Sequence, residues 1–273
     1  MTELLSTDLY KLVQARHGRF LCNPMDTYIG RSMIEYGEFS ENEWIFLSRL
    51  IGENAVVIEA GANMGTLTVP FAKTVGLGGM VYAFEPQLSI FQQLCANLAL
   101  NDLLNVQAFN AGCGSEAGQL SARRLQPNAK NNFGGMSLKI LEADSGPKIR
   151  IERLDDVIDP PRLTLIKADV EGMEIDVLKG AAGLIGQFRP FLYLEAHQED
   201  APPLFRHLYE LDYQIWWHQP FMFSPKNFFG KSENLFGNTI SRNVLALPAE
   251  RKIKVEGLRE VAGEDDYPSK WTR

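Results

Sequence analysis

From residue 56 onward, short runs of apolar residues alternate with longer segments in which apolar side chains recur at helical spacing. The apolar runs predict strands at 56–60, 81–84, 106–109, 163–168, 191–194, 213–217 and 244–247. The amphipathic segments predict helices at 68–75, 90–100, 175–184 and 204–211. Because strands and helices alternate, we expect an α/β fold: a seven-stranded and mostly parallel sheet with helices on both faces.

Three regions lie outside this alternation. Residues 1–51 open with a polar helix or arm and continue with short β-like runs, and Ser40 and Glu43 stand at capping-box spacing before an apolar helical face. We therefore expect an N-terminal helix/β extension packed on a core domain of residues 52–248. The Gly- and Asn-rich stretch 126–146 is too polar for the core, and residues 249–273 are expected to form a charged, peripheral tail.

Composition then narrows the class of protein. The 273 residues are 45% hydrophobic, which is ample for one large core, and the net charge is -7 with no basic stripe, so no nucleic-acid partner is expected. Three distant cysteines, Cys22, Cys95 and Cys113, indicate reduced thiols. No apolar run has membrane-spanning length, and the first residues lack the order of a signal peptide, so we expect a cytoplasmic protein without a membrane partner.

The end of the first predicted strand carries a glycine-rich turn. Gly61 and Gly65 flank Ala62 and Asn63, and such a turn lets a ligand approach the backbone closely. The dinucleotide pattern fails, because Asn63 and Thr66 stand where it requires glycine. Glu59 is also the wrong charge beside a pyrophosphate, whereas it suits a cofactor with positive charge, such as S-adenosyl-L-methionine.

The next two strands end in further candidates for cofactor binding. Glu85, followed by Pro86, lies one βαβ unit after the glycine turn, where an acid accepts both ribose hydroxyls. The alternative is that Glu85 only caps the following helix. Asn110 and Ala111 follow the third strand and are expected to meet the adenine edge.

Four titratable residues follow the fourth and fifth strands. Asp169 and Glu171 stand in KADVEG, and Glu195 and His197 stand in LEAH. If these strands are neighbours, the four side chains converge, and His197, with an ordinary pKa near 6.5, suits a general base. Asp169 can instead order a turn and His197 can be an ordinary loop residue. A divalent metal on these groups is a further alternative, although no metal is expected.

The stretch 216–238 is rich in aromatic residues, Asn and Gly and lies between the last two predicted strands. Insertions at this place lie over the mouth of the pocket, so Trp217, His218 and Asn227 are candidates for contact with an acceptor. An equally weighted alternative is that the aromatic side chains fill a satellite core.

Several of these motifs together resemble the FkbM-type methyltransferases. The resemblance covers roughly residues 36–248 and rests on VVIEAGANMG, VYAFEPQ, KNNFGGMSL, LDDVI, LIKADVEGMEIDVLKGA, LEAH and SRNVLALP. It implies a Rossmann-like methyltransferase fold, S-adenosyl-L-methionine as cofactor, and methyl transfer to a hydroxyl of a sugar or natural product. The family more often carries Asp where this sequence has Glu59.

The expected acceptor is therefore a small molecule or glycan rather than a nucleic acid. Asp159-Pro160-Pro161 is similar to the DPPY-type loop of amino-nitrogen methyltransferases, but Arg162 follows it and it precedes the fourth strand. A nitrogen acceptor, or a nucleotide-binding regulatory protein without methyl transfer, remains the alternative.

Overall fold

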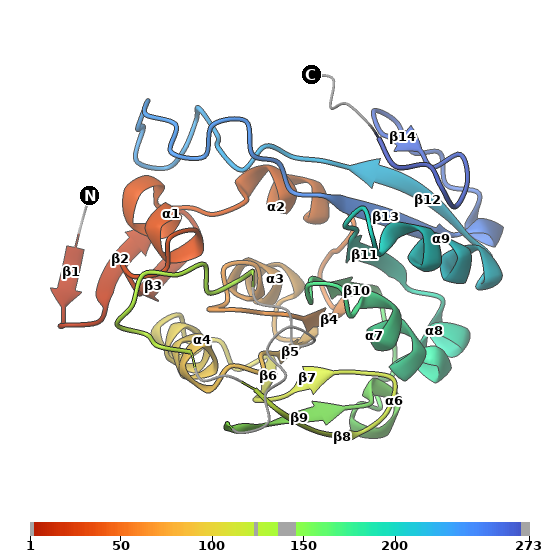
Figure 1. Cartoon of the computed structure of the whole chain (residues 1–273), viewed down its shortest axis with the longest axis horizontal. Helices are drawn as coiled ribbons and strands as arrows, with labels where there is room; N and C mark the ends of the chain where they lie inside the picture. Colours follow the sequence, from red (N-terminus) through yellow and green to blue (C-terminus); the bar gives the residue numbers. More distant parts are fainter. Residues whose placement is uncertain (1–2, 123–124, 136–145, 269–273) are drawn as a thin grey trace.

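The computed structural model describes residues 3–122, 125–135 and 146–268. Its centre is a sheet with the strand order β14-β12-β13-β11-β10-β4-β5-β6 (Figure 1). The strands are β4 (Val56–Ala60), β5 (Met80–Phe84), β6 (Val106–Phe109), β10 (Leu165–Ala168), β11 (Phe191–Glu195), β12 (Tyr213–His218), β13 (Asn243–Pro248) and β14 (Arg259–Glu260). All seven predicted strands are present, and the α/β fold is confirmed.

The sheet is parallel from β6 to β11, and β13 then enters antiparallel between β11 and β12. The β14 strand comes from the tail and pairs with the edge strand β12. Val261 is buried, and the Tyr267 ring meets the ring of Trp217 edge to face. These residues of the expected tail, 249–273, therefore cover the edge of the sheet.

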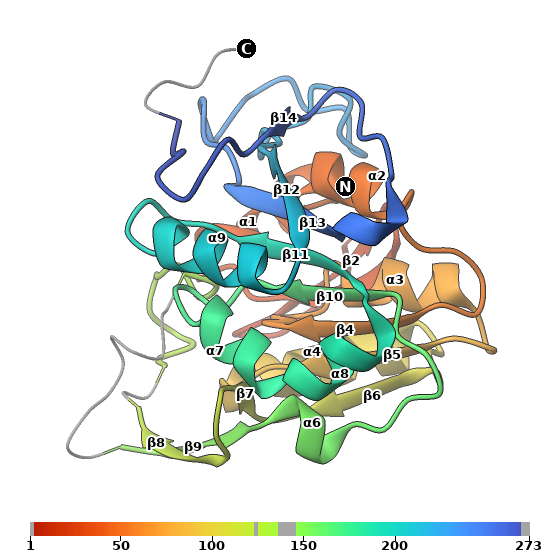
Figure 2. The same ribbon diagram turned by 90° about the vertical axis from the view of Figure 1, so that its right-hand side faces the viewer.

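Residues alternate between the two faces of the strands, and helices cover both (Figure 2). Val57 and Leu165 pack with α2 (Glu41–Leu47) and α3 (Thr68–Val75), and α4 (Leu88–Leu100) lies beside them. Ile58 and Ile166 pack on the opposite face with α6 (Leu154–Val157), α7 (Glu174–Gly180), α8 (Ala182–Phe188) and α9 (Ala201–Glu210). The helix predicted at 175–184 is in fact two helices, which meet at Ala181.

The N-terminal extension begins with an antiparallel sheet of β1 (Glu3–Ser6), β2 (Lys11–Ala15) and β3 (Gly18–Cys22), not with a helix. Phe20 and Cys22 are fully buried in a cluster with Leu94 and Leu98 of α4, which fixes this sheet to the core domain. Helix α1 (Ile29–Tyr36) and α2 follow. Ser40 precedes α2 as expected, but its hydroxyl donates to the Glu43 carboxylate at 2.7 Å instead of capping a backbone N–H.

The stretch 126–146 is not wholly outside the core. Phe133 is buried beside Ile90 and Leu125, whereas residues 136–145, which include the end of the KNNFGGMSL motif, lie outside the described part of the chain. A small sheet of β7 (Gly112–Cys113), β9 (Lys148–Glu152) and β8 (Gly118–Ser121) flanks this stretch. Among the described helices, none is both long and apolar enough to cross a membrane.

Candidate active site

A cavity of about 460 Å³ opens at the carboxyl ends of β4, β5, β10 and β11. Parallel strands place their carboxyl ends at one edge of the sheet, which is where ligands bind in such folds. Eight of the residues predicted to bind the cofactor line it: Glu59, Gly61, Ala62, Asn63, Glu85, Pro86, Ala111 and Asp169. All four predicted catalytic residues also line this cavity: Asp169, Glu171, Glu195 and His197.

The glycine turn has the backbone that its sequence requires. Gly61 has a φ of +83°, and a Cβ at this position would lie 1.9 Å from the carbonyl oxygen of Asp169. Gly65 does not line the cavity but has a φ of +92°, and a Cβ there would lie 2.8 Å from Leu94 Cδ1. The first glycine therefore allows the turn to lie against the end of β10, and the second allows it to pack against α4.

Glu85 is held firmly at the cavity wall. Its two carboxylate oxygens accept the backbone N–H groups of Asn63 at 3.1 Å and Gln87 at 2.8 Å. Burial raises the pKa of Glu85 to about 7. Gln87, which the sequence analysis missed, also lines the cavity, and its Nε2 is buried without a hydrogen-bond partner among the described residues. The wall thus offers an acceptor and an unused donor side by side.

Asn110 does not line the cavity. Its Nδ2 donates to the backbone carbonyls of Glu85 at 2.9 Å and Pro86 at 3.1 Å, so the amide holds the strand end that carries Glu85. The expected contact between Asn110 and the adenine edge is not what this conformation shows, whereas Ala111 does line the cavity.

Beneath the cavity lies a buried charge cluster that the sequence analysis missed. Lys167 is 4% exposed, and its Nζ lies 3.2 Å from Asp169 Oδ2. Burial opposes its charge, but Asp169, Glu59 and Glu43 together hold the pKa of Lys167 above its usual value. Burial raises the pKa of Glu59 to about 7, and Glu59 also accepts the Thr68 hydroxyl at 2.6 Å. The sequence does contain a signal for this cluster: Lys167 lies within an apolar run, and a buried lysine requires partners of opposite charge.

The neighbouring strands β10 and β11 bring the chemical candidates together, as expected. His197 Nε2 lies 3.1 Å from Glu195 Oε2 and 3.3 Å from Glu171 Oε2. Hydrogen bonds to Glu171 and Glu195 raise the pKa of His197 to about 11, and burial raises that of Glu195. The expectation of an ordinary pKa near 6.5 is therefore wrong for this state, because two carboxylates stabilise the imidazolium.

The loop between β10 and α7 is ordered by Glu174 rather than by Asp169. Glu174 is buried, and its Oε1 accepts the N–H groups of Val170 at 3.1 Å and Gly172 at 3.4 Å. Glu171 has a φ of +55° in this loop, which directs its carboxylate to His197. Because Glu174 accepts the backbone N–H groups of this loop, the carboxylates of Asp169 and Glu171 are not needed to order it and can face a ligand.

The three predicted acceptor residues do not line the cavity. Trp217 packs edge to face on Phe205, and its Nε1 donates to the backbone carbonyl of Asp266 at 3.2 Å. His218 is 9% exposed, stacks on Phe46, and lies 2.7 Å from the Tyr193 hydroxyl. Trp217 and His218 are strand residues buried on opposite faces of β12, so they serve packing, as the alternative had it, although Trp217 lies in the main core and not in a satellite core.

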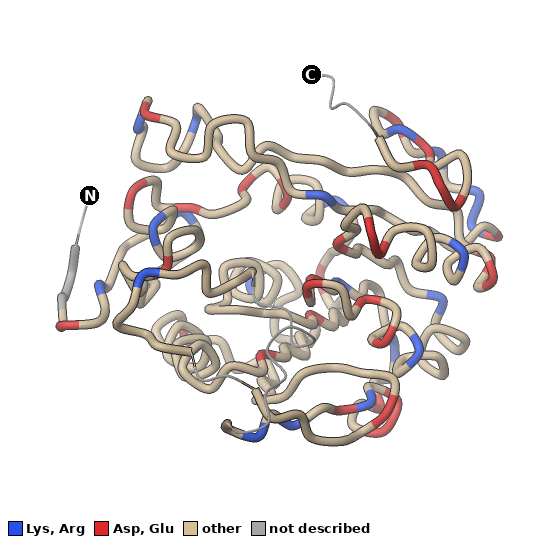
Figure 3. Tube along the Cα trace, viewed as in Figure 1, with Lys and Arg blue, Asp and Glu red and all other residues tan. Residues whose placement is uncertain are grey.

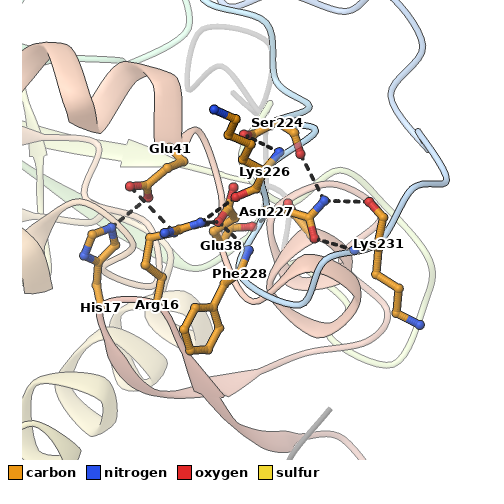
Figure 4. Close-up of polar contacts among 10 residues, drawn as sticks. Arg16, His17, Glu38, Glu41, Ser224, Lys226, Asn227, Phe228 and Lys231 are labelled. Atoms are coloured by element: carbon orange, nitrogen blue, oxygen red, sulfur yellow. Dashed lines mark hydrogen bonds and ion pairs between the residues drawn. The ribbon is translucent and has the colours of Figure 1, made fainter.

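Asn227 shapes a loop instead of contacting the cavity (Figure 4). Its amide bonds the backbone of Ser224 and Lys231. The same loop is fixed to the N-terminal extension, because Arg16 donates to the Lys226 carbonyl and the Glu38 carboxylate accepts the Phe228 N–H.

Two other segments line the cavity in place of these residues. Met222 and residues 239–242 come from the β12–β13 connection, and Tyr28, Phe39, Ser40 and Glu43 come from the N-terminal extension. Figure 1 shows this connection passing over α1 and α2. The sequence analysis placed the connection over the pocket mouth, but nothing in its composition indicated which residues reach the cavity.

Comparison of the sequence with known protein families identifies the family of this chain. A model of the methyltransferase FkbM domain matches residues 59–215, which is more than half of the chain. The chain belongs to the FkbM methyltransferase family. The resemblance stated from the motifs is thus confirmed, and S-adenosyl-L-methionine is the cofactor of this family.

The FkbM-family chain is also similar to individual proteins. It is 29% identical to Methyltransferase sdnD of Sordaria araneosa over 157 residues, covering 46% of this chain and 60% of that protein, so it spans only part of that relative. A crystal structure of methyltransferase FkbM from Methylobacillus flagellatus KT is 19% identical with a TM-score of 0.48, covering 72% of this chain and 44% of that one. A structure of a Streptococcus mutans protein in complex with SAH is 13% identical with a TM-score of 0.46, covering 76% and 96%.

Proposed function

We propose that this chain transfers a methyl group from S-adenosyl-L-methionine to a hydroxyl oxygen of a small molecule, such as a sugar or natural product. One observation carries the proposal: the glycine turn with Glu85 and the cluster of Glu171, Glu195 and His197 line a single cavity. A cofactor held by the first group therefore faces the polar side chains of the second.

The residues present fit the cofactor. Gly61 lines the cavity after β4, and Glu85 and Gln87 offer an acceptor and a donor for the ribose and base. Glu59 and Glu43 supply negative charge, which suits a ligand with sulfonium and ammonium groups. The cofactor brings an activated methyl group, so the chain must align the acceptor and help to remove its proton.

Carboxylates at the cavity wall support an acceptor that loses a proton. Asp169, with a side chain 41% exposed, is oriented by the Lys167 ammonium, and Glu195 and Glu171 stand beside His197. A hydroxyl is a weak nucleophile, so a nearby acceptor for its proton accelerates its attack. Neutral amines need this help less, which favours oxygen over nitrogen.

A small acceptor also agrees with the charge of the molecule. Lys and Arg are interspersed with Asp and Glu along the trace (Figure 3), and the net charge is -7. Phosphate contacts supply most of the affinity for nucleic acids, and they require a basic surface. The cavity volume lies within the range of small-molecule sites.

The test uses cofactor with a labelled methyl group and separate pools of polar metabolites, glycans, RNA, DNA and protein. We expect label in a metabolite or glycan, mapped by mass spectrometry to oxygen, with release of S-adenosylhomocysteine. Label mainly in RNA, DNA or protein would overturn the acceptor class, and label on nitrogen would overturn the chemistry. Cofactor binding without turnover in any pool would favour a regulatory protein.

A further inference from the structure

The side chains of Glu171, Glu195 and His197 form a compact group at the cavity wall. His197 Nε2 lies 3.1 Å from Glu195 Oε2 and 3.3 Å from Glu171 Oε2, and the three atoms all lie within 4.8 Å of one another. Two adjacent elements fix them: β11 ends at Glu195, and the loop ordered by Glu174 carries Glu171. We propose that these three side chains bind a divalent cation of the Mn²⁺ type.

The spacing of the atoms fits such a cation. Neighbouring ligands of an octahedral ion, each about 2.2 Å from it, lie about 3 Å apart. The distances of 3.1 and 3.3 Å are close to this spacing. His197 therefore has the spacing of a neighbouring ligand to each carboxylate, and the two carboxylates, within 4.8 Å of each other, would close on a cation whose other positions face the cavity.

The Glu195 carboxylate gives independent support. Its Oε2 is buried, and among the described residues it has the ion-pair contact with His197 Nε2 at 3.1 Å but no hydrogen bond of good geometry. A buried carboxylate oxygen without a well-oriented donor is costly, so its place at a cavity wall favours a ligand that would complete its coordination. A cation that binds here displaces the His197 proton, and the resulting neutral imidazole and two carboxylates carry a formal charge of about -2, which a divalent ion neutralises and a neutral molecule does not.

The role of the cation rests on the proposed function, whereas its binding does not. A hydroxyl bound at an open position would become more acidic, because the cation stabilises the alkoxide. The oxygen attacks the methyl carbon, the carbon–sulfur bond breaks and leaves a neutral thioether, and the hydroxyl proton passes to Asp169. An acceptor with two adjacent hydroxyls, or a hydroxyl beside a carbonyl, would occupy two open positions.

Binding can be measured without cofactor or acceptor. The full chain is treated with chelator, dialysed and titrated with Mn²⁺, with free Mn²⁺ followed by electron paramagnetic resonance. We expect one ion per chain, and at least a tenfold weaker affinity in Glu195→Gln and in His197→Gln, because each loses a ligand. His207→Gln is the matched control: His207 lies on α9 beside the exposed Glu210, away from the cavity.

Circular dichroism establishes that each variant is folded. Absence of saturable Mn²⁺ binding, or equal binding by wild type and both cavity variants, would overturn the proposal. Methylation of an oxygen acceptor by chelator-treated enzyme at the untreated rate would overturn the role of the ion while sparing the proposed function. Mn²⁺ binding in a chain that methylates nitrogen would support the cation site and overturn the proposed function.

Discussion

Gly61 and the backbone of Asp169 touch across the neighbouring strands β4 and β10. A Cβ at Gly61 would lie 1.9 Å from the Asp169 carbonyl oxygen, and the φ of +83° is itself unfavourable for any other residue. The contact links the glycine turn to the loop that carries Asp169 and Glu171. A substitution that displaces the turn therefore also displaces this loop.

Gly61→Ala should therefore abolish measurable binding of S-adenosylhomocysteine and lower the free energy of unfolding by at least about 2 kcal/mol. Calorimetry and urea unfolding measure the two effects. Gly186→Ala is the control, because Gly186 lies in α8 and a Cβ there meets nothing within 4 Å. That variant should gain about 0.5–1 kcal/mol of stability and bind normally. Binding by Gly61→Ala at wild-type affinity would show that the turn does not carry the cofactor.

Glu85→Gln should weaken cofactor binding by about 1.5–3 kcal/mol, since it removes a charged acceptor from the cavity wall. Glu53→Gln, a change at an exposed loop position, is the control for the loss of charge. Calorimetry with S-adenosyl-L-methionine measures both. Equal affinity in wild type and Glu85→Gln would show that the Glu85 carboxylate does not bind the cofactor.

The affinity for the cofactor should also rise with pH. Burial raises the pKa of Glu85 to about 7 in the ligand-free chain, so below pH 7 the carboxyl is mostly protonated and is a poorer acceptor. Wild-type affinity is therefore expected to increase between pH 6 and pH 8. The increase should be smaller in Glu85→Gln but not absent, because burial raises the pKa of Glu59 in the same way. A pH-independent wild-type affinity would contradict this.

The sequence predicted the sheet well because its central strands are buried on both faces and so read as continuous apolar runs. Gly61 and Glu85 were found because they directly follow such runs. Trp217 and His218 were misassigned although they belong to a strand: residues of a strand alternate between faces, and here both faces are covered.

Features set by tertiary packing could not be predicted. The pKa of His197 depends on Glu171, which is 26 residues away and is directed by a positive φ. The tail pairs with β12 through only two residues, too few to give a strand pattern. The charge partners of Lys167 come from β4, α2 and its own strand end, so only the folded chain reveals them.

His218 should make the fold sensitive to acid. Burial lowers its pKa to about 4, so the folded chain resists a proton that the unfolded chain accepts below about pH 6.5. The stability from this residue is complete above pH 6.5 and is lost as the pH falls towards 4, by at most about 3 kcal/mol. His218→Gln should lose less stability than wild type between pH 7 and pH 5 in urea unfolding, whereas His207→Gln should follow wild type. Parallel curves for wild type and His218→Gln would refute this.

Arg16 should control access of the acceptor, because it joins the N-terminal extension to the connection that lines the cavity. Its guanidinium lies 2.7 Å from the buried Glu38 carboxylate and donates to the Lys226 carbonyl at 2.8 Å (Figure 4). Arg16→Ala removes both contacts and leaves Glu38 with the Phe228 N–H. Because Met222 and residues 239–242 of this connection line the cavity, loosening it should disturb the acceptor side of the site more than the glycine turn.

We expect Arg16→Ala to raise the KM for the acceptor at least about fivefold and to speed proteolysis within residues 219–242, with unchanged affinity for S-adenosylhomocysteine. Lys226→Ala is the matched control, since Arg16 uses the backbone carbonyl of Lys226 and that contact survives the change. Peptide mapping after brief chymotrypsin treatment, whose aromatic cleavage sites neither variant changes, calorimetry and initial rates supply the three readouts. An Arg16→Ala variant that loses cofactor affinity along with acceptor affinity would show that the extension supports the whole site, and not its acceptor side alone.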